Sequence, residues 1–172
     1  MRERWKPNVT VAAVIERRVD GRIEFLLVEE ETAEGLRLNN PAGHLDPGES
    51  PLQGAIREAL EETTCAFTPD CIVGIYLTRF QATTAGRDDD VTYVRFTFGG
   101  VAGAPDPSRV LDRGIVRTLW MSLEEVRASG ARHRSPLVLR GIEDWTAGRR
   151  FPLDLVHCDP SVHAGGEPGA DT

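Results

Sequence analysis

The most informative segment of this 172-residue chain reads Gly43-His-Leu-Asp-Pro-Gly-Glu-Ser-Pro-Leu-Gln-Gly-Ala-Ile-Arg-Glu-Ala-Leu-Glu-Glu-Thr-Thr64. Its second half predicts a helix from Pro51 to about Thr63. Ser50 is a good N-cap, proline suits the first helical position, and Gln53 completes a capping box. The first half is rich in glycine and proline and predicts a loop that leads into the helix.

The predicted helix has two contrasting faces when residues are placed about 100° apart. The apolar face, expected to pack on the core, contains Leu52, Ala55, Ile56, Ala59 and Thr63. The opposite face contains Arg57, Glu58, Glu61 and Glu62. Glutamates this close repel one another, and no lysine is interspersed among them. The helix alone is compatible with an acidic solvent-exposed face or with a site for Mg²⁺ or Mn²⁺, which prefer carboxylate oxygens.

The spacing of Gly43, Glu49 and Arg57-Glu-Ala-Leu-Glu-Glu62 resembles the Nudix box, G-x5-E-x7-R-E-U-x-E-E-x-G-U, where U is aliphatic. Six fixed positions match, which would arise by chance in on the order of one such chain in ten thousand or fewer. Thr64 departs from the pattern because it stands where the family has glycine. A β-branched residue disfavours positive φ, so we expect a different exit from the helix, without loss of the chemistry.

Flanking segments extend the resemblance to the bacterial phosphatase-type Nudix hydrolases, over about Trp5 to Cys158. These segments are Trp5–Thr10, Asn40–Leu45, Val94–Phe98, Trp120–Glu125 and Arg134–Val138. The resemblance implies an α/β fold, the Nudix α/β/α sandwich with a mixed β-sheet, over residues 1–158. Residues 159–172 are rich in glycine, proline and acid, and we expect them to form a disordered tail.

Alternating strand and helix signals agree with a mixed sheet. The predicted strands are Val9–Ile15, Ile23–Glu29, Leu36–Asn40, Cys71–Phe80, Val91–Phe98 and Ile115–Trp120. A turn at Val19–Gly21 separates the first two strands, and a polar loop is predicted at Ala82–Asp90. Two further helices are expected, a short one beginning at Ser122 and a longer one over Pro136–Thr146.

The resemblance implies hydrolysis of a phosphoanhydride bond by water with Mg²⁺ as cofactor, Mn²⁺ being possible. Glu58 and Glu62 are the first choice for side-chain metal ligands, with the backbone carbonyl of Ala42. Glu61 is either a further ligand or the general base, and the sequence does not separate these roles. Glu49 and Arg57 are expected to orient the carboxylates. The other candidate bases are Asp89, Asp112 and Glu124.

The residues that contact substrate are less sharply indicated. Arg95, in a predicted strand, is either a phosphate clamp or a surface arginine. Asn39 and Asn40 either contact a base or phosphate oxygen, or serve only the turn before Pro41. The expected substrates are small nucleoside di- or triphosphates, or the pyrophosphates of thiamine and its hydroxymethylpyrimidine precursor. Alternatives are a nucleotide sugar, a dinucleoside polyphosphate, or nucleotide sensing without hydrolysis.

Composition narrows the partners and the compartment. The chain has 27 acidic and 20 basic residues, for a net charge of −7, so binding to nucleic acid is not expected. A divalent cation would allow such an acidic protein to hold a small phosphorylated substrate. No apolar run is long enough to span a membrane. The three cysteines are an odd number with no C-x-x-C pair, which argues against a disulfide framework and a structural zinc site. We therefore expect a cytoplasmic monomer or homodimer.

Overall fold

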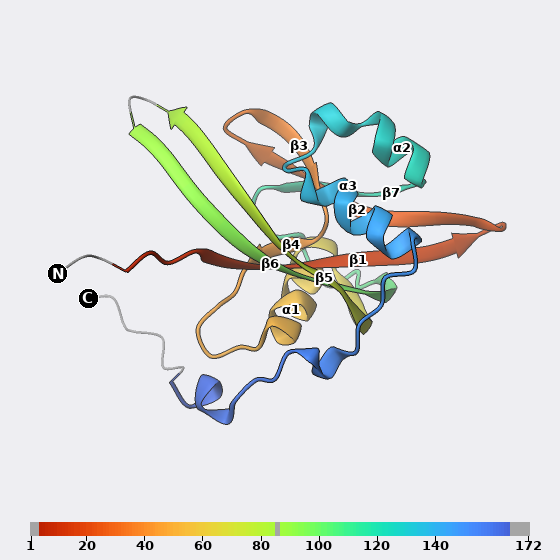
Figure 1. The fold of residues 1–172 in the computed structure, drawn as a ribbon. Helices are drawn as coiled ribbons and strands as arrows, with labels where there is room; N and C mark the ends of the chain where they lie inside the picture. The colour runs from red at the N-terminus through yellow and green to blue at the C-terminus, as the bar shows by residue number, and fades with distance from the viewer. Residues whose placement is uncertain (1–3, 85–86, 166–172) are drawn as a thin grey trace.

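The computed structural model describes residues 4–84 and 87–165, which form a mixed β-sheet with helices on both sides (Figure 1). The strands are β1 (Asn8–Val19), β2 (Arg22–Thr32), β3 (Gly35–Asn39), β4 (Ala42–His44), β5 (Cys65–Thr84), β6 (Arg87–Pro105) and β7 (Ile115–Met121). The α-helices are α1 (Pro51–Thr63), α2 (Leu123–Ala128) and α3 (Leu137–Thr146). Short 3₁₀-helices are η1 (Gly130–Arg132), η2 (Leu153–Leu155) and η3 (Pro160–Gly165).

The sheet divides where β1 and β2 diverge. The strand order is β3-β2-β1-β6-β5, with β4 on β1 and β7 on β2. β1 and β2 pair only at their adjoining ends, from Glu16↔Phe25 to Val19↔Arg22. In the N-terminal part of β1, the short strand β4 pairs antiparallel with β1 on one side, and β6 pairs parallel with β1 on the other. The loop that precedes α1 is thereby held against the centre of the sheet.

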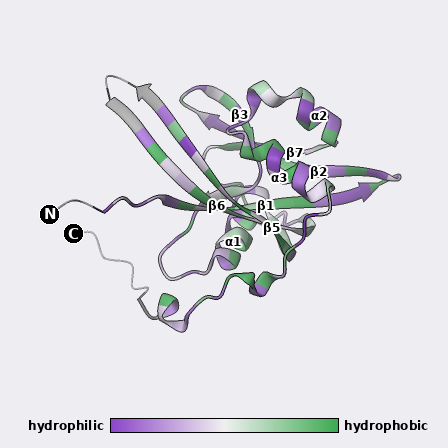
Figure 2. Cartoon of the chain, in the orientation of Figure 1, coloured by the Kyte–Doolittle hydropathy of each residue, from purple (hydrophilic) through white to green (hydrophobic). Residues whose placement is uncertain are grey.

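Two apolar clusters fill the space between the sheet and its helices. On one side, Val11, Ala13 and Ile15 of β1 pack with Ala55 and Ala59 of α1. On the other side, Val14 and Leu27 pack with Val138, Ile142 and Trp145 of α3 and its surroundings. β1 supplies both clusters because alternate side chains of a strand point to opposite faces. Figures 1 and 2 show this arrangement, with apolar central strands between α1 and the α2–α3 pair. The predicted α/β/α sandwich is confirmed.

The predicted strands are all present, and most are longer than expected. The turn at Val19–Gly21 is also present, with positive φ at Asp20 and Gly21. The polar loop predicted at Ala82–Asp90 is wrong, because β5 continues to Thr84 and β6 begins at Arg87. The antiparallel ladder extends to the Thr84↔Arg87 pair, so backbone hydrogen bonding overrides the polar composition. Strand β4 was not predicted.

Helix α1 begins as expected but buries a different set of side chains. Both hydrogen bonds of the capping box between Ser50 and Gln53 are present. The inward position predicted for Ile56 is wrong, since 36% of that residue is exposed. Glu62, placed on the outer face by the sequence analysis, is instead buried. The cause is β4, which packs beside α1 and covers the side of the helix that carries Glu62.

The expectation of a different exit at Thr64 is also wrong. Thr64 adopts the left-handed conformation, with φ 60° and ψ 7°, which a β-branched residue enters only at a cost of about 1–2 kcal/mol. Two backbone hydrogen bonds hold it there: its N–H donates to the Leu60 carbonyl, and its carbonyl accepts from the Asp106 N–H. Tertiary contacts therefore impose the turn that glycine would make freely.

The end of the described chain returns to the α1 side of the molecule. Residues Pro160–Gly165 form η3, and the His163 ring lies 2.9 Å from the Gly48 carbonyl (Nδ1 to O) in the loop before α1. Residues 166–172, in the segment where a tail is predicted, lie outside the described residues. The proposed domain boundary at residue 158 stays a prediction.

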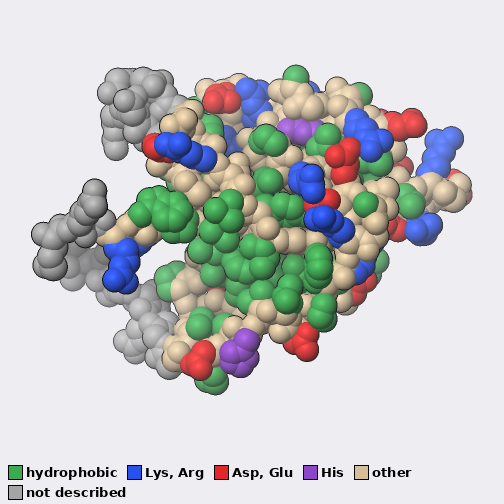
Figure 3. Space-filling model, viewed as in Figure 1, with side chains coloured by type: hydrophobic (Ala, Val, Ile, Leu, Met, Phe, Trp, Pro, Cys, Tyr) green, Lys and Arg blue, Asp and Glu red, His purple; other side chains and the backbone are tan. Residues whose placement is uncertain are grey.

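The surface is mixed in character. Figure 3 shows hydrophobic side chains gathered in the middle of one face, and exposed apolar residues of β5 include Ile75 and Leu77. Within the described residues, no helix is both long enough and apolar enough to cross a membrane.

The contact between α3 and the sheet gives a test of the fold. Gly99 of β6 lies directly beneath the Trp145 ring, and a β-carbon there would overlap it. Gly99→Ala should therefore lower the free energy of unfolding by about 1–3 kcal/mol. Gly141→Ala is the matched control, because its β-carbon would meet Val14 and Thr97 at 3.4 and 3.6 Å, ordinary contacts. In a helix interior this change should be neutral or stabilising by up to about 1 kcal/mol. Denaturant unfolding of both variants measures the difference, and equal effects would contradict the packing described.

Candidate active site

The loop before α1 is held by Glu49. One of its carboxylate oxygens, Oε1, accepts a hydrogen bond of 2.8 Å from the Asp46 N–H and so closes the turn. A β-carbon at Gly54 would lie 2.7 Å from that same oxygen, so only glycine leaves room for it. Burial would raise the pKa of Glu49, but hydrogen bonds from Arg57 and from the Asp46 N–H outweigh this and lower it. Glu49 is therefore a half-buried, ionised anchor.

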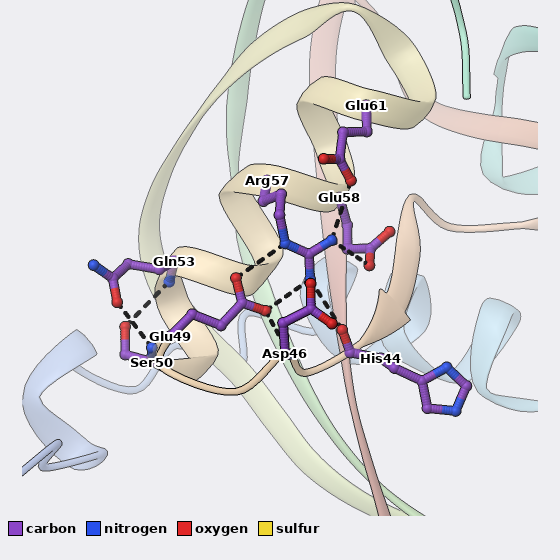
Figure 4. A network of polar contacts seen from close by, with 8 residues as sticks. All are labelled: His44, Asp46, Glu49, Ser50, Gln53, Arg57, Glu58 and Glu61. Atoms are coloured by element: carbon purple, nitrogen blue, oxygen red, sulfur yellow. Dashed lines mark hydrogen bonds and ion pairs between the residues drawn. The ribbon is translucent and has the colours of Figure 1, made fainter. Parts of the chain in front are cut away.

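Arg57 connects this anchor to the other acids of the helix (Figure 4). Its Nε and Nη2 donate to the two oxygens of Glu49 at 3.0 and 2.7 Å, a bidentate pair. Its Nη1 donates to Glu58 at 2.8 Å and to Glu61 at 3.1 Å. Nη2 also donates to the His44 carbonyl at 3.0 Å, which fixes the end of β4. These partners, Glu49 first, raise the pKa of Arg57, so it stays charged.

Gly43 explains why the box begins with glycine. A β-carbon at this position would overlap the Glu58 carboxylate, so the backbone of β4 and the Glu58 side chain lie in direct contact. Glu58 is 12% exposed. Burial raises its pKa, and the neighbouring Arg57 only partly offsets this. The carboxylate is therefore held against the backbone next to Ala42.

Glu62 approaches the same segment from one helical turn farther along. Its Oε2 accepts a hydrogen bond of 2.9 Å from the Ala42 N–H, and the residue is 7% exposed. Burial raises its pKa to about 8, the Ala42 N–H opposes the shift, and the carboxylates of Glu58, Glu30 and Asp112 add to it. Two carboxyl groups that are costly to ionise are thus crowded where Glu58 and Glu62 flank Ala42 and Gly43.

This donor set suits a hard divalent cation. Glu58, Glu62 and the Ala42 backbone lie together, and burial raises the pKa of both carboxyl groups, so a bound cation would favour their ionised forms. Within the described ranges, no three acidic, histidine or cysteine side chains already form a metal-holding group. Instead, Glu58 and Glu61 each accept a hydrogen bond from Arg57. The residues fit a metal ion, although the side chains are not arranged around one.

A cavity of about 340 Å³ opens beside this acidic segment. Its lining residues come from strands β1 to β4, from the β5–β6 ribbon and from the loop before α3. The lining residues are Thr10, Glu30, Asn39, Ala42, Gly43, His44, Thr78, Arg79, Phe80, Tyr93, Arg95, Arg134, Ser135 and Pro136. Because Gly43 contacts Glu58 and also lines the cavity, the acidic segment and the cavity adjoin each other.

Arg95 and Asn39 both line the cavity, as substrate-contacting residues would. Burial lowers the pKa of Arg95, and the carboxylates of Glu30 and Glu62 oppose this. Asn40 is 1% exposed and does not belong to the lining. Two lining residues not predicted from the sequence, Glu30 and Arg134, form an ion pair at 3.6 Å. The only signal for Glu30 was its place among three glutamates at the end of a predicted strand.

The alternative general bases lie in different parts of the chain, and only some of them are near α1. The Asp112 N–H donates to the Glu61 carbonyl at 3.0 Å, which places this residue at the C-terminal end of α1. Glu124 is exposed in the first turn of α2, a helix that packs on β2, β7 and α3. The side chain of Asp89 lies outside the described residues. Of the described alternatives, Asp112 is therefore the one joined to the acidic helix.

Residues 6–140 match the sequence pattern of the NUDIX domain. The chain belongs to the Nudix family. It is 34% identical to the phosphatase NudJ of Escherichia coli strain K12 over 153 residues, or 88% of this chain and 92% of that protein. A NUDIX hydrolase from Nitrosomonas europaea is 49% identical, with a TM-score of 0.78 covering 90% of this chain and 98% of the other.

A more distant structure agrees with this assignment. The MutT protein of Methanosarcina mazei is 25% identical, with a TM-score of 0.61 over 86% of this chain and all of the other. Together with NudJ, these relatives identify the chain as a Nudix hydrolase that acts on phosphoanhydride bonds.

The environment of Glu62 predicts an unusual pH dependence of stability without metal. Because folding raises this pKa from 4.5 to about 8, the folded state binds a proton more tightly, and stability falls as pH rises through that interval. Glu62→Gln does not titrate and keeps an acceptor for the Ala42 N–H. Relative to the unmodified protein, it should gain about 1–3 kcal/mol between pH 5 and pH 8. Denaturant unfolding in EDTA measures this, and a pH-independent difference between the two proteins would contradict it.

Proposed function

We propose that this Nudix hydrolase uses Mg²⁺, or Mn²⁺ in its place, to cleave small nucleoside di- or triphosphates or thiamine-type pyrophosphates. The observation that carries the proposal is the crowding of Glu58 and Glu62 against the backbone at Ala42 and Gly43, beside a cavity. When bound there, the metal ion lowers the pKa of a coordinated water and neutralises charge that develops on the phosphate.

Each residue of the box has a role in this proposal. Glu58, Glu62 and the Ala42 carbonyl hold the metal ion, while Glu49 fixes Arg57, which in turn orients Glu58. The Glu61 side chain is 44% exposed, and its Oε2 contacts Arg57. Because the side chain is accessible, Glu61 can act as a further metal ligand or as the general base. Asp112 remains the alternative base because its backbone is bonded to α1.

Arg95, Asn39 and Asn40 form the proposed substrate-contacting group. Arg95 and Asn39 line the cavity, and Asn40 lies next to the Ala42 segment. All three carry a buried side-chain nitrogen or oxygen that has no hydrogen-bond partner among the described residues: Nη1 of Arg95, Oδ1 of Asn39 and Nδ2 of Asn40. Such atoms favour partners supplied by a ligand, because leaving them unpaired is costly.

Glutamine substitutions at Glu58 and Glu62 test the metal site. Each keeps the size of the side chain but removes one negative charge, so each should reduce turnover by roughly 100-fold or more and weaken Mg²⁺ binding. Glu34→Gln, at an exposed glutamate between β2 and β3, is the matched control and should leave turnover unchanged.

The measurement is phosphorus NMR in ¹⁸O-water on a panel of nucleotides and thiamine-type pyrophosphates, with and without EDTA. Release of phosphate or pyrophosphate that EDTA abolishes supports the proposal, and the position of the label identifies the phosphorus attacked. Well-folded protein that cleaves none of these compounds, or variants as active as the control, would overturn it.

A further inference from the structure

One part of the cavity carries a carboxylate, which does not suit phosphate, together with an amide and a guanidinium. Glu30 of β2, Asn39 of β3 and Arg95 of β6 all line it. Each has a buried atom without a hydrogen-bond partner among the residues that the structure describes: Oε1 of Glu30, Oδ1 of Asn39 and Nη1 of Arg95. Unpartnered buried polar atoms are rare in folded proteins, and three of them around one cavity mark a place where ordered water or a ligand supplies the partners.

The chemistry of these groups restricts the ligand. Burial raises the pKa of Glu30, and the charges of Arg134 and Arg95 together with a hydrogen bond from Asn39 oppose this. In its ionised form the Glu30 carboxylate only accepts hydrogen bonds, and a guanidinium only donates them. The ligand must therefore present a donor toward Glu30 and an acceptor toward Arg95. An ionised phosphate offers acceptors alone, and the Glu30 carboxylate repels it. Arg134, at 3.6 Å, compensates part of the Glu30 charge, but it supplies no hydrogen bond to the buried oxygen.

The aromatic lining and the volume of the cavity favour a flat ring as the ligand. Three of its lining residues are aromatic: His44, Phe80 and Tyr93. The rings of His44 and Tyr93 are 6.1 Å apart between centroids and inclined by 58°. A volume of about 340 Å³ falls at the small end of ligand pockets and accommodates one ring system with its substituents.

We propose that Glu30 and Arg95 recognise an amino-substituted nitrogen heteroaromatic ring in the substrate. The ring amino group donates to Glu30, and the neighbouring ring nitrogen accepts from Arg95. Aminopyrimidines and aminopurines share this edge, whereas their oxo counterparts reverse it. The inference rests on the proposed function, since it names the half of the substrate that is not cleaved, and it makes Glu30 a specificity-determining residue.

The test compares nucleotides that differ only at this edge. Cytidine and adenosine diphosphates carry the amino edge, and uridine and inosine diphosphates carry the oxo edge. The unmodified protein should prefer the amino member of each pair by roughly 10- to 100-fold in kcat/KM, mainly through KM. Glu30→Gln, which presents a donor as well as an acceptor, should abolish or reverse that preference. Glu31→Gln, at the exposed neighbour on β2, should preserve it.

Three outcomes would overturn the inference while leaving the proposed function intact. The first is equal turnover of both members of each pair by the unmodified protein. The second is an equal loss for both members in Glu30→Gln, which would indicate a merely structural role. The third is discrimination against 2′-deoxyribose without discrimination between bases, which would mean that the polar groups contact a sugar hydroxyl.

A binding measurement separates failure of this inference from failure of the proposed function. If no compound of the nucleotide and thiamine-type pyrophosphate panel is hydrolysed, the proposed function fails, and isothermal titration with the same four diphosphates still decides the specificity. Binding of the amino members at least about tenfold more tightly, lost in Glu30→Gln, would support the inference. Equal affinities for amino and oxo members would overturn it.

Discussion

The arrangement of the whole site depends on Arg57 and the carboxylates around it. Its bidentate pair with Glu49 ties α1 to the loop before it, and its bond to the His44 carbonyl ties that loop to β4. Because one guanidinium makes both sets of contacts, to Glu49 and to the His44 carbonyl, the acidic helix is held at a fixed position against the sheet. Glu58 is then pressed on Gly43, and Glu62 reaches the Ala42 N–H. The same contacts that stabilise the packing of α1 therefore assemble the acidic segment.

The division of the sheet gives this segment its cavity. β1 and β2 pair only near their shared turn, so β4 takes a place beside β1, and residues from both sides of the divergence face one space. Glu30 and Asn39 come from one side, and Arg95 and Tyr93 from the other. Polar groups that are far apart in sequence are thereby buried together. The carboxyl groups of Glu58 and Glu62 adjoin this space, and the carboxylate and guanidinium of Glu30 and Arg95 lie in its lining.

The Nudix box accounts for α1 and for the loop before it. At Thr64 and in the β5–β6 ribbon, the backbone conformation differs from the one that the local sequence favours. Thr64 makes the left-handed turn normally given to glycine because its backbone is bonded on both sides, to Leu60 and to Asp106. The long β5–β6 ribbon similarly carries strand pairing through a stretch whose composition predicts a loop. In both places, backbone hydrogen bonds override the intrinsic preference of the residues.

The sequence by itself determined the cap and extent of α1, the strand-rich α/β class and the identity of the box residues, since these follow from local chemistry and spacing. Tertiary structure alone decided that Glu62 is buried rather than solvent-exposed, because the strand that covers it, β4, is only three residues long and has no pattern of its own. It also decided that Glu30 faces the same cavity as Arg95. That pairing joins β2 to β6 across a divergence in the sheet, and no local periodicity encodes such a contact.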